Sequence, residues 1–109
     1  LIAVPALEQS EQDFPKDYNA PARLARIYFE AKRFDDARFA IARAGARVYG
    51  PRALRIFLLA ADIAHARNAS AEEKEALDVA IARSLNLTLS PFQQELRAKA
   101  IERRNALGK

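Results

Sequence analysis

The stretch KRFDDAR, residues 32–38, lies between two segments whose apolar residues recur at helical spacing, and it contains neither glycine nor proline. Its charges favour a break between two helices, because cations stabilise the C-terminal end of a helix and carboxylates stabilise the N-terminal end. The basic pair Lys32–Arg33 suits the end of one helix, and the acidic pair Asp35–Asp36 suits the start of the next. We therefore expect a tight helical hairpin, with the Phe34 side chain buried between its helices.

Apolar stripes extend the helical prediction on both sides of this stretch. Leu24 and Ile27 share one face of a helix over residues 20–32. Residues 35–48 carry a narrow stripe of small residues, which lets the two helices pack closely. The same spacing predicts four further helices, at residues 4–13, 51–67, 71–85 and 90–107. The helix at 51–67 is apolar around most of its circumference and should be the most buried.

Local signals mark where these helices begin and end. Asn19 is a candidate N-cap for the helix that follows it. Gly50 and Pro51 form the strongest boundary, because glycine favours the position after a helix and proline favours the first turn of the next. SAEE from Ser70 and SPFQ from Ser90 each match a capping box, in which the serine hydroxyl accepts an amide N–H three residues on. The second hairpin then has a turn about three residues longer than the first, at little entropic cost.

The composition indicates one all-helical domain. Its 109 residues are half apolar, include only three glycines and no cysteine, and carry a net charge of +4. So much apolar material excludes a disordered tail, and the lack of cysteine excludes disulfides and thiolate metal sites. No apolar run reaches the roughly 20 residues of a membrane-spanning helix, so we expect no membrane insertion. Because it lacks methionine, we interpret the chain as a fragment, and its compartment and oligomeric state stay open.

Charge is unevenly distributed along the chain. Residues 21–55 contain nine basic residues against three acidic ones, whereas residues 1–20 contain four carboxylates against one lysine. A basic block attracts phosphates. Arginines spaced three to five residues apart on helices are more often solvated, with their aliphatic stems over alanine-rich seams, and no aromatic residues interleave here as base-stacking platforms would require.

Residues 18–51 resemble a tetratricopeptide repeat in the order and period of their residues. Leu24 and Ala25 stand at the family's leucine and small positions, and Tyr28 at the tyrosine of its first helix. Phe34 stands at the aromatic position before the acidic pair. The small and apolar positions of the second helix are matched by Ala37, Ile41 and Ala44.

The resemblance has departures and a weaker continuation. Pro21 stands where an early aromatic is typical, and YGPR at residues 49–52 replaces the usual proline-terminated turn. Residues 54–87 are similar to a degenerate second repeat, whose matching positions are Phe57, Ala61, Ala64, Ala76 and Ala80. A looser similarity, over residues 13–37 and 48–55, is to tetratricopeptide-like tails that follow a thioredoxin-like domain in some bacterial proteins.

The resemblance implies an all-α fold, in which antiparallel helical hairpins stack as a short right-handed solenoid with a C-terminal capping helix. Residues 1–17 would form a leader helix that ends an upstream region or caps the N-terminus, and residues 18–109 the repeat-like domain. The first hairpin, the second hairpin and the capping helix would span residues 18–51, 52–87 and 90–107.

The resemblance also implies a non-catalytic module that binds a partner protein, a peptide or an adjacent domain of its own chain. Binding would use the concave face made by the first helices of the hairpins, where we expect Asn19, Arg26, Phe29, Arg55, Leu58, Asp62 and His65. Arg26 would pair with a carboxylate and Phe29 would hold an apolar side chain. Alternatively, Arg26 pairs with Glu30 of its own helix, and the terminal helices cover Phe29 and Leu58.

Catalysis has little support in the sequence. The chain has one histidine, no glycine-rich phosphate loop and no ligand-spaced cluster, so we predict no enzyme activity, no cofactor and no metal site. Asp62 and His65 share a helix face and are the candidate acid–base pair. Two other functions stay open: the basic block binds nucleic acid or another polyanion, or the domain is a structural spacer.

Overall fold

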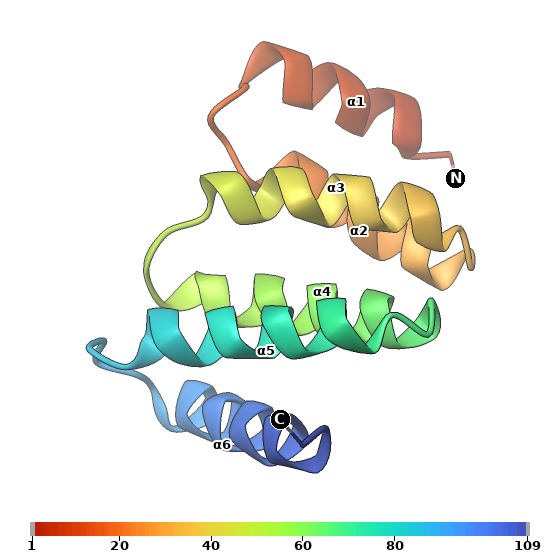
Figure 1. Ribbon diagram of the computed structural model, residues 1–109. Coiled ribbons are helices and arrows are strands. Elements are labelled where there is room, and N and C mark those ends of the chain that lie inside the picture. The colour runs from red at the N-terminus through yellow and green to blue at the C-terminus, as the bar shows by residue number, and fades with distance from the viewer. Residues whose placement is uncertain (1, 109) are drawn as a thin grey trace. The chain divides into compact units, whose positions relative to one another are not determined.

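The computed structural model describes residues 2–108, which form helices and no strands (Figure 1). The α-helices are α1 (Val4–Asp13), α2 (Asn19–Glu30), α3 (Phe34–Arg47), α4 (Ala53–Ala66), α5 (Ser70–Ser84) and α6 (Pro91–Ala106). A 3-10 turn, η1 (Gly50–Arg52), precedes α4, so the α-helix predicted at residues 51–67 begins later than expected. The all-helical fold class is confirmed. The chain divides into two compact units, the first running to Val48 and the second starting at Tyr49.

The first unit is the hairpin of α2 and α3 with α1 packed against α2. Small residues line the contact between the hairpin helices: Ala25 of α2 and both Ala37 and Ala44 of α3 are fully buried, next to the buried Leu24 and Ile41. Small side chains allow the two helix backbones to approach closely. The stripe of small residues predicted for residues 35–48 therefore faces the partner helix.

The turn of the first hairpin needs no glycine because Lys32 itself adopts a left-handed conformation, with φ 61°. The N–H of Arg33 donates to the carbonyl oxygen of Tyr28 at 2.8 Å, and the N–H of Lys32 donates to that of Phe29 at 3.0 Å. These bonds satisfy carbonyls at the end of α2, as in a Schellman cap. Phe34 opens α3, where it is half-buried and packs on Phe29 with 5.8 Å between ring centroids.

The turn of the second hairpin has the same construction. Asn68 is left-handed with φ 58°, and the N–H of Ala69 donates to the carbonyl oxygen of Ala64 at 2.9 Å. Three residues separate α4 from α5, as three separate α2 from α3. The prediction of a longer second turn was wrong, because Ser70 is the first residue of α5 and not its cap. No side-chain hydrogen bond caps this helix, so the capping box predicted at Ser70 is also wrong.

Of the other two predicted caps, the one at Asn19 is wrong and the one at Ser90 is correct. Asn19 is the first residue of α2 and not its N-cap. The Asp17 carboxylate accepts hydrogen bonds from the backbone N–H of Asn19 at 3.0 Å and from its Nδ2 at 2.8 Å. The box at Ser90 is confirmed, since Ser90 Oγ accepts from the N–H of Gln93 and Gln93 Oε1 accepts from the N–H of Ser90.

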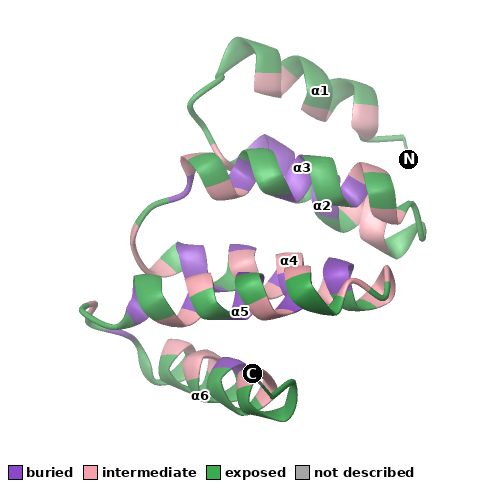
Figure 2. Cartoon of the chain, in the orientation of Figure 1, coloured by how far each residue is buried: buried purple, intermediate pink, exposed green. Residues whose placement is uncertain are grey.

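The second unit is the hairpin of α4 and α5 with α6 packed mainly on α5 and also on α4. As predicted, α4 is the most buried helix, with seven buried residues. The core where the three helices meet comprises Ala61, Ala76, Leu77 and Ala100, with Leu58, Ala60 and Ile81 packed against it. Figure 2 shows that α1 and α6 are mostly exposed, in contrast to the hairpin helices. Ala100 is the only buried residue of α6.

Candidate functional site

The candidate residues of the first unit lie on α2. Arg26 is exposed, and its guanidinium lies 6.0 Å from the ring centroid of the half-buried Phe29. Within residues 2–108 Arg26 forms no ion pair, so the alternative pairing with Glu30 does not occur there. Phe29 packs on Phe34, which gives an aromatic pair beside an uncompensated cation. Asn19 is exposed at the start of the same helix, where its side chain donates to Asp17.

A shallow cleft lies between α1 and α2. It has a volume of about 380 Å³ and is lined by Ala3, Ala6, Leu7, Arg23, Arg26 and Ile27. Arg26 therefore belongs both to this cleft and to the surface next to Phe29. Arg23, which sequence reasoning did not single out, reaches the cleft because it precedes Arg26 by one helical turn.

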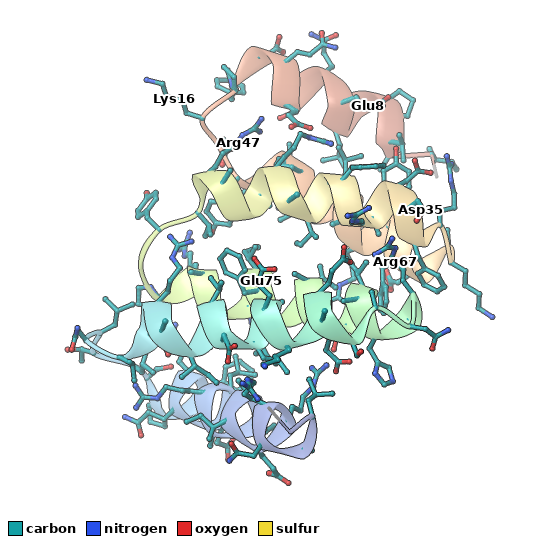
Figure 3. All side chains as sticks on the ribbon, viewed as in Figure 1. Glu8, Lys16, Asp35, Arg47, Arg67 and Glu75 are labelled. Carbon is teal, nitrogen blue, oxygen red and sulfur yellow. The ribbon has the colours of Figure 1, made fainter. Side chains whose placement is uncertain are left out.

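Three arginines of the basic block in the first unit are paired with carboxylates, two of them with Glu11, which precedes the block. Glu11 of α1 forms ion pairs with two arginines of α3. Its Oε2 lies 2.7 Å from Arg43 Nε and 3.0 Å from Arg47 Nη1. Arg47, labelled in Figure 3, also donates to the backbone carbonyl of Asp17. Arg33 pairs with Asp36 at 2.7 Å. The charge asymmetry along the sequence thus becomes charge complementarity within the folded unit.

Acidification is expected to loosen α1. The hydrogen bond from Arg43 lowers the pKa of Glu11 below its ordinary 4.5, and the charges of Arg43 and Arg47 act in the same direction against the opposing effect of burial. A carboxyl whose pKa is lower in the folded state stabilises that state above its unfolded pKa, and this contribution is lost as the pH falls through the folded value. Amide protection factors along α1 should therefore fall as the pH drops below the ordinary Glu11 pKa of 4.5.

Two variants of α1 test the origin of this pH effect. Glu11→Gln should lower protection already at neutral pH and should remove most of the additional loss in acid. Glu8→Gln, a matched change at an exposed position of the same helix, should behave like the parent. Equal protection in the two variants would show that the Glu11 ion pairs do not hold α1.

The four candidate residues of the second unit are engaged inside that unit. Arg55 of α4 lies 5.3 Å from the ring centroid of Phe92 on α6. Leu58 packs against the core cluster that contains Ala100 of α6. Asp62 accepts a 2.8 Å hydrogen bond from Arg103 of α6. Leu58 therefore packs beneath the terminal helix α6, as one of the two alternatives predicted.

A buried carboxylate connects the remaining candidate, His65, to α6. The Glu73 side chain is 7% exposed, and its Oε1 lies 3.1 Å from Nδ1 of His65. Its Oε2 accepts a hydrogen bond from Arg103 at 3.1 Å. Arg103 thereby joins Asp62 of α4 to Glu73 of α5, so three helices meet through one guanidinium.

Sequence reasoning missed Glu73 and Arg103, but the two hairpins together contain the signal. Lys32 and Asn68 are the corresponding left-handed residues of the two turns. Five residues beyond each stands a buried position, occupied by Ala37 in the first hairpin and by Glu73 in the second. A carboxylate at a buried position needs a cationic or hydrogen-bonding partner. Only packing against α6 identifies that partner as Arg103.

The described residues show no constellation typical of catalysis. Within residues 2–108 no hydrogen bond joins Asp62 to His65, since Asp62 pairs with Arg103 and His65 with Glu73. Across residues 2–108, no three histidine or acidic side chains gather in a way that would hold a metal ion. In the same range no helix is long and apolar enough to cross a membrane.

A hairpin with small residues at its contact, preceded by one helix, is the geometry of a helical repeat. The family model of the tetratricopeptide repeat matches residues 3–56. The chain contains a tetratricopeptide repeat domain. The matched region takes in α1, the whole first hairpin and the beginning of α4. No curated protein and no solved structure matches the chain.

The tetratricopeptide repeat at residues 3–56 has a general functional meaning. Tetratricopeptide repeats mediate protein–protein interactions and are typically non-catalytic scaffolds. The match extends upstream of residues 18–51 and ends before most of the second hairpin. The thioredoxin-like domain expected upstream, and the division into residues 1–17 and 18–109, stay predictions.

Proposed function

We propose that this tetratricopeptide repeat domain is a non-catalytic interaction module that binds a partner protein or peptide through the α2 surface formed by Asn19, Arg26 and Phe29. The observation that carries the proposal is the uncompensated guanidinium of Arg26 beside the Phe29–Phe34 pair. Arginine and aromatic residues dominate the binding energy of many protein interfaces. The cation orients a carboxylate, and the ring contacts an apolar side chain.

The second hairpin has a different role. Arg55, Leu58, Asp62 and His65 contact α6 or its partner Glu73, so a ligand at these residues would compete with contacts that hold the unit together. We therefore assign partner binding to the first hairpin and attachment of α6 to these four residues. A partner that covers Leu58 or replaces Arg103 beside Asp62 would have to displace α6, whereas the His65 side chain is 76% exposed.

Polyanion binding is the weaker candidate. Three of the arginines in residues 21–55 are already paired with carboxylates, namely Arg33, Arg43 and Arg47. Non-specific binding to nucleic acid depends on the number of phosphates that free cations neutralise. Pairing within the fold lowers that number and leaves the nucleic-acid function with less support than the charge of the sequence indicates.

An affinity pull-down from lysate of the source cell tests the proposal. The double variant Arg26→Glu, Phe29→Ala is compared with Arg38→Glu, Phe39→Ala, which removes another exposed arginine–phenylalanine pair of the same unit. A partner protein should be retained by the parent and the control at about 0.1 M and about 0.5 M salt, and lost with the first variant.

The other outcomes point to the alternative functions. A partner retained equally by both variants contradicts the α2 surface. Nucleic acid that is captured at low salt and released at high salt supports the polyanion function, because counterion release makes phosphate contacts salt-sensitive. If nothing is retained, the domain is a structural spacer.

A further inference from the structure

The cleft between α1 and α2 combines apolar walls with unpaired cations. Its apolar residues are Ala6 and Leu7 of α1, Ala3 directly before α1, and Ile27 of α2. Ala3 and Ala6 are exposed and small, so they leave room for an incoming helix to approach α1 closely. The volume of about 380 Å³ is within the range of ligand-binding clefts.

Neither arginine of this cleft has a carboxylate in direct contact, although the charge of Asp17 acts on Arg23 from a distance. Within residues 2–108 neither Arg23 nor Arg26 forms an ion pair, whereas Arg33, Arg43 and Arg47 of the same unit do. The two side chains are one helical turn apart, which places two cations along the same side of the cleft. A ligand that covers the cleft must therefore bring negative charge as well as apolar surface.

We infer that the α1–α2 cleft binds an acidic amphipathic helix of a partner protein, with its apolar residues against Leu7 and Ile27 and its carboxylates on Arg23 and Arg26. The inference rests on the proposed function and specifies the class of its ligand. An amphipathic helix suits a groove between two helices because residues three and four apart form a continuous apolar ridge. A nucleic-acid backbone fits less well, since phosphates would satisfy the arginines and leave the apolar wall uncovered.

Selection from a display library of helix-forming peptides tests this ligand class on the full chain. Enriched peptides should carry a bulky apolar residue one turn from an aspartate or glutamate. The enriched peptide and a copy with its acidic residues changed to the corresponding amides are then synthesised, and their dissociation constants are measured by fluorescence anisotropy. The amide copy should bind roughly tenfold more weakly.

Variants locate the peptide on the protein. The double variant Arg23→Glu, Arg26→Glu should raise the dissociation constant of the acidic peptide by roughly tenfold or more, because charge repulsion replaces attraction. Ala6→Phe, which fills the cleft from the exposed side of α1, should also weaken binding of the peptide. Lys16→Glu, Lys32→Glu makes the same charge change at exposed positions outside the cleft and should stay within about twofold of the parent. Circular dichroism confirms that each variant keeps its helical content.

Three results would overturn the inference. These are no enrichment above background, enriched peptides without acidic residues, and binding that is unaffected by Ala6→Phe. Binding that survives Arg23→Glu and Ala6→Phe but is lost with Phe29→Ala would place the peptide beside Phe29, so the proposed function would stand while the cleft inference fails. If no peptide binds and the pull-down retains nothing, both fail.

Discussion

Replacing Leu77 by alanine is expected to destabilise the second unit by about 2–5 kcal/mol. Leu77 is 0% exposed and lies in the cluster where α4, α5 and α6 meet, with Ala61 and Ala100 as neighbours. The buried neighbours are alanines, which cannot extend into the space, whereas Leu58 and Ile81 pack against the cluster and can fill part of it, so the cost should be in the middle of this range. Small domains are marginally stable, so the loss is a large share of the total.

Urea denaturation followed by circular dichroism measures this effect, and amide exchange assigns it to helices. Leu85→Ala is the matched control, because the same change at a residue 61% exposed should cost less than about 0.5 kcal/mol. Protection should be lost in α4, α5 and α6. Equal denaturation midpoints for the two variants would show that the three-helix cluster does not stabilise the unit.

Arg103→Met is expected to cost about 1–3 kcal/mol and to release α6 from the hairpin. The substitution leaves the Glu73 carboxylate buried with only His65 beside it, and it leaves Asp62 unpaired. Breaking a fully buried ion pair costs about 3–5 kcal/mol, but the Arg103 side chain is 34% exposed, so we expect a smaller loss. Because Ala100 is the only buried residue of α6, these polar contacts are a major part of its attachment.

Arg104→Met is the control for this prediction. Arg104 pairs with Asp78 at 2.6 Å, but the Asp78 side chain is 50% exposed, and such surface pairs contribute less than about 1 kcal/mol. Hydrogen exchange should show early loss of protection along α6 in Arg103→Met and near-parent protection in Arg104→Met. If both variants lose the same stability, burial of Glu73 has no energetic consequence.

Most of the fold could be predicted because its signals are local. Apolar residues at spacings of three and four predicted all the α-helices, and the ends of α1 were correct to the residue. The serine–glutamine box at Ser90 formed as expected, since both partners lie within one turn. The match of residues 3–56 to the tetratricopeptide repeat agrees with the alternation of small and large residues in the first hairpin.

The wrong predictions concern the cap at Ser70 and the length of the second turn, where the sequence is compatible with two local structures. SAEE and SPFQ look alike as capping boxes, but only SPFQ forms one. The left-handed Asn68 ends α4 so early that Ser70 already lies in the next helix. A non-glycine residue in this conformation leaves no distinctive mark in the sequence, although asparagine tolerates it better than most.

The sequence by itself determined the helices, the first hairpin and its likeness to a tetratricopeptide repeat, because helical periodicity and small-residue contacts depend on neighbours a few positions away. The tertiary structure decided which charges are free to act. Glu11 neutralises Arg43, 32 positions away, and Arg103 compensates Glu73, 30 positions away, while Arg23 and Arg26 stay unpaired within residues 2–108. Charges interact through space over a few ångströms, so their pairing depends on how the helices pack.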